Sequence, residues 1–245
     1  MNKYMKADLY RIRTRIPRYI VLVIMMALMG LILFFVSKEQ TIYQMTDMLT
    51  KAITYACPIL GLVEYLFVYG DDFKAKTMQI AIGTGVKRRH VVLAKWLEVI
   101  ILCVIDYVIL FAIILFICLL RGIQLDAGPV ADILILLLFG LVKTTACIGV
   151  TMILVFATQG TALGMLLYLA EMTGIVNTIF KLVFSFKHIE KLRLDRFLLT
   201  NLENIACSRM IVGTFSVGHI LGIIIYFAVF YIIATHVFKR KELEF

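Results

Sequence analysis

Six long runs of apolar residues divide the chain, and most polar residues gather in the segments between them. The runs cover residues 19–36, 52–69, 96–120, 133–156, 163–184 and 215–238. Each has about the 18 or more residues that a helix needs to cross a hydrocarbon core about 30 Å thick. The pattern predicts an all-α integral membrane protein with six transmembrane helices, forming one membrane domain over residues 1–245.

Composition supports a lipid environment. Hydrophobic residues make up 62% of the 245 positions, which is more than one soluble domain of this size buries. The net charge of +9 would indicate nucleic acid in a soluble protein. Here the basic residues flank the apolar runs, so we interpret them as a topology signal and as attraction to anionic membrane lipid. We expect no nucleic-acid partner.

The basic residues also predict an orientation. They concentrate in segments 3–18, 74–95 and 239–241, which lie on one side of the membrane if six helices cross it. Cytoplasmic flanks carry the excess of Lys and Arg, so both termini are predicted to be cytoplasmic. Five basic residues between positions 187 and 209 fall on the outer side, where they are interleaved with acidic residues.

The segment before the first run is predicted to form an interfacial helix over residues 3–18. Met5, Leu9, Ile12 and Ile16 recur at helical spacing, and arginines project from another face. That pattern describes a helix lying in the membrane interface. The alternative is a basic anchor that only orients the first span.

The loop between the second and third runs, residues 71–95, is predicted to hold a short amphipathic helix. Asp71 or Asp72 can cap it, and Gly83 and Gly85 end it. One face would carry Phe73, Thr77, Ile80 and Ala81. Such a helix between two spans suits docking onto a soluble partner.

Residues 185–214 form an outer segment before the last run that mixes apolar and charged side chains. Its apolar content indicates contact with the bundle or the outer leaflet. Two interpretations remain open, a gate that contacts substrate and a lid without a ligand.

Four ionisable residues fall inside the runs: Glu64, Asp106, Lys143 and Glu171. At about 1.5 Å of rise per residue they form one layer, about 12–15 Å from the cytoplasmic edge. A charge near the bilayer centre costs about 2.5–3.5 kcal/mol on insertion scales, so we expect pairing or a wet cavity. Lys143 with Glu171 is the preferred pair. The layer is either structural, a polar patch in an export path, or a proton relay.

Small residues are candidates for helix packing. Gly160 with Gly164, and Gly218 with Gly222, are four residues apart and allow close approach within or between subunits. In the second run, Pro58 with Gly61 weakens the backbone ladder and marks a plausible bend.

No catalytic, cofactor-binding or metal-binding motif is found. The segment from Gly83 to Lys87 lacks the spacing of a phosphate-binding loop, so we expect no ATP hydrolysis by this chain. Ser216 and His219 share a helical face, but the usual glycine-flanked serine and second-helix histidine of an intramembrane protease are missing. Four of the five cysteines lie inside the runs, so no disulfide framework is implied.

The loop of residues 71–95 resembles the signature of the permease subunits of type-two ABC exporters. The shared features are an acidic start, a short helix, a glycine-containing turn, basic residues and a Lys at the head of the third run. They are carried by Asp71 and Asp72, Lys76 and Thr77, Gly83 to Gly85, Arg88 and Arg89, and Lys95. Residues 6–9 (KADL) and 238–243 (FKRKEL) are also similar to that family. In size the chain is most similar to Gram-positive peptide or lantibiotic immunity permeases.

The resemblance implies that the loop is a coupling helix seated in a cleft of a separate ATPase subunit. The residues given this role are Phe73, Thr77, Ile80, Ala81, Gly83, Gly85, Arg88 and Arg89. It also implies two permease copies, identical or paralogous, with two ATPase copies that hold ATP and Mg. The expected setting is a bacterial plasma membrane, and the expected substrate is an amphiphilic peptide, antibiotic or lipid-like molecule. The alternatives are an ion-coupled secondary carrier, a membrane enzyme and a passive immunity protein.

Overall fold

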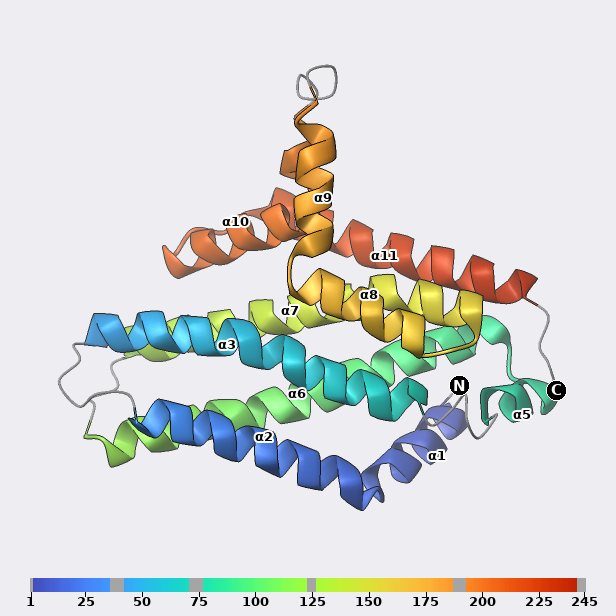
Figure 1. Ribbon diagram of the computed structural model, residues 1–245, viewed down its shortest axis with the longest axis horizontal. Coiled ribbons are helices and arrows are strands. Elements are labelled where there is room, and N and C mark those ends of the chain that lie inside the picture. The colour runs from blue at the N-terminus through green and yellow to red at the C-terminus, as the bar shows by residue number, and fades with distance from the viewer. Residues whose placement is uncertain (1, 36–41, 71–76, 123–126, 187–192, 242–245) are drawn as a thin grey trace.

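The computed structural model describes residues 2–35, 42–70, 77–122, 127–186 and 193–241, which form helices and turns without a strand (Figure 1). The long helices are α2 (Ile16–Phe35), α3 (Ile42–Tyr65), α6 (Arg88–Leu120), α7 (Ala127–Thr158) and α11 (Val217–Arg240). The shorter ones are α1 (Asn2–Arg13), α5 (Thr77–Gly83), α8 (Ala162–Met172), α9 (Ile175–Phe184) and α10 (Leu199–Ile211). A π-helical turn, η1 (Leu66–Gly70), continues α3, and a 3-10 turn, η3 (Leu194–Phe197), precedes α10.

Four helical stretches of the described residues are long and apolar enough to cross a membrane. They are Leu49–Gly70, Arg88–Leu120, Ala127–Thr158 and Val217–Arg240, corresponding to the second, third, fourth and sixth apolar runs. The pair α8 and α9 adds a fifth if the two count as one broken span. In α2 the apolar stretch is Ile16–Leu28, which is shorter than a span. The all-α class is therefore confirmed for this part of the chain, and its four or five candidate spans suggest a multi-pass membrane protein.

The fifth apolar run is not the continuous helix that its hydropathy predicts. α8 ends at Met172, and α9 begins at Ile175 with its axis turned by 66°. Between them Gly174 has a φ of 77°, a left-handed conformation that ends a helix and that glycine adopts without steric cost. Both halves are apolar, so hydropathy does not record the change of direction. α9 stands away from the bundle in Figure 1, and none of its side chains is buried.

The N-terminal helix is shorter than predicted. α1 ends at Arg13 and α2 begins at Ile16, so residues 3–18 form parts of two helices. Pro17 accounts for the break, because proline has no amide hydrogen and is tolerated only in the first turn of a helix. Arg18 thereby belongs to α2 and is buried, although the sequence placed it on an interfacial surface.

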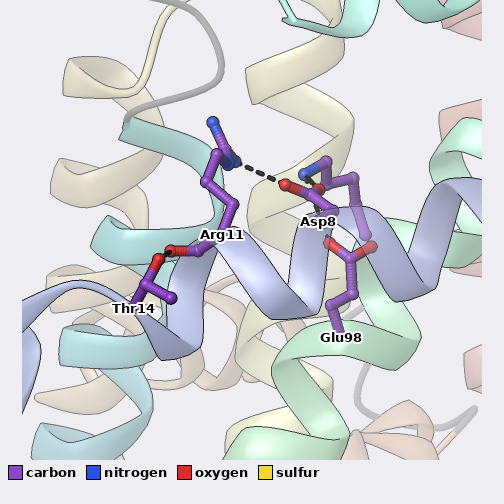
Figure 2. Close-up of polar contacts among 5 residues, drawn as sticks. Asp8, Arg11, Thr14 and Glu98 are labelled. Atoms are coloured by element: carbon purple, nitrogen blue, oxygen red, sulfur yellow. Dashed lines mark hydrogen bonds and ion pairs between the residues drawn. The ribbon is translucent and has the colours of Figure 1, made fainter.

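Buried charges fasten α1 to α6 (Figure 2). The ammonium of Lys95, which is fully buried, forms an ion pair with the Asp8 carboxylate and lies 3.2 Å from Glu98 Oε2. Arg11 Nη2 lies 2.6 Å from the other oxygen of Asp8. Breaking one partner of such a network leaves an uncompensated buried charge, which is strongly destabilising. α1 is thus docked on the bundle rather than resting on lipid alone.

Helix α7 is central and packs against α3, α6, α8, α10 and α11. Glycines allow the closest contacts. A Cβ on Gly61 would lie 2.6 Å from the Tyr168 hydroxyl and would also overlap Thr144, and one on Gly140 would lie 2.7 Å from Cys57 Sγ. Gly61 therefore marks a helix contact, in addition to the bend that the sequence predicted near Pro58.

One member of each predicted glycine pair lies at a close contact. A Cβ on Gly164 would lie 2.5 Å from Val155 Cγ2, and one on Gly222 would lie 3.0 Å from Leu202 Cδ1. The members without a neighbour closer than 4 Å are Gly160 and Gly218. Both contacts lie within one copy of the chain.

Buried tyrosines bridge the helices around Pro58. Tyr168 donates a hydrogen bond to the Pro58 carbonyl at 2.7 Å, and Tyr107 donates to the Cys57 carbonyl at 2.8 Å. Both bonds tie α3 to its neighbours α8 and α6 beside Pro58, where proline interrupts the backbone ladder.

Candidate functional site

The four ionisable residues predicted to form one layer lie in two separate groups. Glu64 and Asp106 contact Arg18 where α2, α3 and α6 meet. Lys143 and Glu171 line a cavity formed on the other side of α7 by α7 to α11 and η3. The cavity, called the chamber below, has a volume of about 450 Å³.

Arg18 provides the cation that the first group needs. Its Nε lies 2.9 and 3.0 Å from the two Glu64 oxygens, and its Nη2 lies 3.4 Å from Asp106 Oδ1. All three side chains are buried. A fork-shaped guanidinium suits this arrangement because it can donate to one carboxylate through two nitrogens. The sequence carried a signal for this cation: the apolar runs hold three acidic residues and only one basic residue, so a second basic partner was to be expected.

The expected ion pair between Lys143 and Glu171 is not formed. Within the described part of the chain, no carboxylate oxygen comes within 4.0 Å of the Lys143 ammonium. Both residues line the chamber, but no direct bond joins them. α9 and α10 also line this cavity.

Glu203 on α10 joins Lys143 and Glu171 in the chamber. The sequence treated it as one of several charges outside the membrane, yet only 6% of it is exposed. Its Oε1 is buried without a hydrogen-bond partner among the described residues. The signal that could have found it is the apolar pair Leu202 and Ala206 on the same face of α10, both buried.

The environment of Glu203 favours its neutral form. Burial raises its pKa most, Lys143 lowers the pKa through its positive charge, and Glu171 raises it through like charge. The result is a pKa of about 8, against an ordinary value of 4.5. α10 is outside the candidate spans, but this carboxyl is as secluded from water as a group within them.

Two hydrogen bonds hold the outer wall of the chamber. Thr200 donates from its hydroxyl to Asn177 Oδ1 at 2.8 Å and joins α10 to α9. Tyr226 donates to the Phe197 carbonyl at 2.7 Å and joins α11 to η3. The described part of the outer segment therefore forms a chamber wall, which is compatible with both the gate and the lid interpretation.

At one end of the bundle lie α5, α1 and the end of α11 (Figure 1). Phe73 lies outside the described residues. Within α5, Ile80 is 63% exposed whereas Ala81 is buried. The two residues predicted to share one docking face therefore differ in exposure. Thr77 opens α5 and Gly83 ends it, and Gly85 lies in the turn that follows, with a φ of 95°.

Arg88 contacts this chain itself. Its Nη1 donates to the carbonyls of Phe238, Lys239 and Lys241 at 2.8, 3.1 and 2.6 Å, at the carboxyl end of α11. A guanidinium there satisfies carbonyls that the helix leaves unpaired. Arg89 is exposed. The start of α6 and the end of α11 are thus fixed at the same end of the bundle.

Ser216 and His219 are in contact, with 2.5 Å between Oγ and Nδ1. Arg209 Nη1 lies 3.4 Å from the same hydroxyl. No carboxylate of the described residues contacts His219, so the third group that orients a catalytic histidine is not provided. Across the described ranges, His, Cys, Asp and Glu also form no group of three that could hold a metal ion.

No known protein-family model matches the chain, and no curated protein is significantly similar to it.

Proposed function

We propose that this chain is the membrane-spanning subunit of an ATP-driven exporter that moves an amphiphilic substrate outward and receives its energy from a separate ATPase subunit. The observation that carries the proposal is the chamber. It combines apolar walls with three ionisable side chains, the composition of a site for a molecule with one polar and one apolar part. Lys143 is 16 residues from the start of α7, about 24 Å along the helix, so the chamber reaches mid-membrane depth.

The end that carries α5 is the proposed ATPase surface. Ile80 is an exposed apolar side chain on a short helix that lies between α3 and α6 in the chain. Exposed apolar residues on a water-facing surface are typical of docking sites. Arg88 in this proposal stabilises the bundle beside that surface, and Arg89 remains available to the partner.

The topology proposed has six spans, with α2 as the first and α8 with α9 as a broken fifth. It is supported by the contacts that bring α1, the start of α6 and the end of α11 to one end, as an even number of crossings would do. Both termini would then be cytoplasmic. The exporter would contain two such chains in a bacterial plasma membrane.

Topology can be tested by thiol labelling. A cysteine replacing Arg196, in a Cys207→Ser background, should react with an impermeant reagent added outside intact cells. A cysteine replacing Arg89 is the matched control and should react only after the cells are opened. Both positions are exposed, so the opposite pattern would reject this orientation.

The partner can be tested with Ile80→Asp. ATPase activity should co-purify with the intact chain and be mostly lost with this variant, because a charge replaces the apolar contact. Val212→Asp makes the same change at another exposed position, outside α5, and should retain the activity. If both variants retain the same ATPase activity after purification, the partner does not dock at Ile80.

An ion-coupled carrier is the second candidate, and Glu203 is the observation that favours it. A buried carboxyl with a raised pKa is a possible proton carrier. Export measured at constant ATP should survive collapse of the proton gradient if an ATPase drives it. Loss of export under these conditions would favour the carrier.

A further inference from the structure

Acidic side chains outnumber basic ones in the lining of the chamber. Two carboxyl groups, Glu171 and Glu203, face one ammonium, Lys143, and no ion pair joins them among the described residues. Glu203 is the most buried of the three, with one oxygen that receives no hydrogen bond. An unsatisfied buried acceptor is costly and is stabilised by any donor that reaches it.

The rest of the lining favours a cation over an anion. An anionic group drawn to Lys143 would also meet the Glu171 carboxylate, which repels it, and it would gain nothing from the neutral Glu203 carboxyl group as a charge partner. Aromatic rings are part of the wall and come from three elements, α9, η3 and α11: Phe180, Phe184, Phe197, Tyr226 and Phe230. Ring faces attract ammonium and guanidinium groups and also contact apolar chains.

We infer that the chamber binds the cationic end of an amphiphile at Glu203, and that this cation takes the place of a proton that Glu203 carries when the chamber is unliganded. The protonated carboxyl group loses its proton to the buffer as the carboxylate pairs with the incoming cation. No other bond changes, and charge is conserved. The inference rests on the proposed function in taking the chamber as the path of the substrate, but its test needs no ATPase.

The groups around Glu203 support this exchange. The titratable side chains that share the chamber are Lys143 and Cys147 on α7, Glu171 on α8 and Tyr226 on α11, and the described lining from α9 and η3 adds none. With a pKa of about 8, Glu203 is about nine-tenths protonated at pH 7. A bound cation stabilises the carboxylate, so cation affinity should rise as the pH increases toward and beyond 8.

The test is titration calorimetry of the purified full chain in non-ionic detergent, with decyltrimethylammonium as the probe and decanol as its uncharged counterpart. Running the titration at pH 7 in two buffers of different ionisation enthalpy counts the protons released. We expect about 0.9 proton released per cation bound, and an affinity about tenfold higher at pH 9 than at pH 7. Decanol should bind more weakly and release no proton.

Glu203→Gln is nearly isosteric and should abolish both the proton release and the pH dependence. Glu203→Asp keeps the carboxyl group and should retain release with weaker binding. Asp195→Asn removes an exposed carboxylate from the same outer segment, outside the chamber lining, and should behave like the unmodified chain.

Three results would overturn the inference: no proton release from the unmodified chain, equal binding of decanol, or an unchanged pH dependence in Glu203→Gln. The first two need no variant to fold. If proton-linked binding is found but no ATPase docks at α5, the exporter proposal fails and the chamber assignment stands. If the ATPase docks and no linkage is seen, only the inference fails.

Discussion

Replacing Arg18 by Met tests whether the buried cluster of α2, α3 and α6 is an energetic unit. Glu64 receives its short contacts of 2.9–3.0 Å from this one guanidinium, whereas Asp106 receives a single contact at 3.4 Å. Arg18→Met strands a buried carboxylate and should lower the free energy of unfolding by about 3–5 kcal/mol. Asp106→Asn removes only the negative charge at the longer contact, where the amide oxygen can still accept, and should cost about 1–2 kcal/mol.

The decisive comparison is the double variant Arg18→Met with Glu64→Leu. It leaves no stranded Glu64 charge, so it should be less destabilised than the sum of the two single variants by about 2 kcal/mol. The assay is reversible unfolding by SDS in mixed micelles, followed by far-ultraviolet circular dichroism. Arg196→Met is the control, since this arginine is exposed, and should change stability by less than about 0.5 kcal/mol. Additivity of the single variants within about 0.5 kcal/mol would refute the cluster as a coupled unit.

Three further outcomes can be measured with the same assay. Gly61→Val should lower stability by about 1–3 kcal/mol because its Cβ has no room, whereas Gly218→Val, with no neighbour within 4 Å, should be nearly neutral. Lys143→Met combined with Glu171→Leu should be close to additive because no ion pair joins them, and strong coupling would show that the pair forms after all. In the unliganded chain, the raised pKa of Glu203 contributes stability that is fully present below pH 4.5 and is lost as the pH rises through 8. Glu203→Gln should remove this slope, and an unchanged slope would assign it to another group.

The fold class and the membrane environment follow from the sequence by itself. A helix that spans a hydrocarbon core must be about 20 residues long and apolar, because lipid offers no partner for backbone polar groups. Four of the six apolar runs accordingly correspond to helices that are long enough to span. The sequence also showed that charges inside the runs needed partners, because stranding a charge there is costly.

Only the tertiary structure decided which partners those charges have. Arg18 is 46 residues from Glu64 and 88 from Asp106 along the chain, so no local pattern links them. Their meeting depends on how α2, α3 and α6 approach each other. The four charges therefore fall into two groups, whereas counting residues along each run gave only their depth in the membrane.

The chamber depends on tertiary structure in the same way. Its walls come from six elements, and it exists because the chain turns at Gly174 and returns through η3 and α10. Hydropathy measures whether a residue prefers lipid or water, but it carries no information on the direction of the backbone after a turn. Glu203 was for that reason interpreted as an outer surface charge, whereas the packing of α10 against α7 and α11 buries it in the cavity that Lys143 also lines.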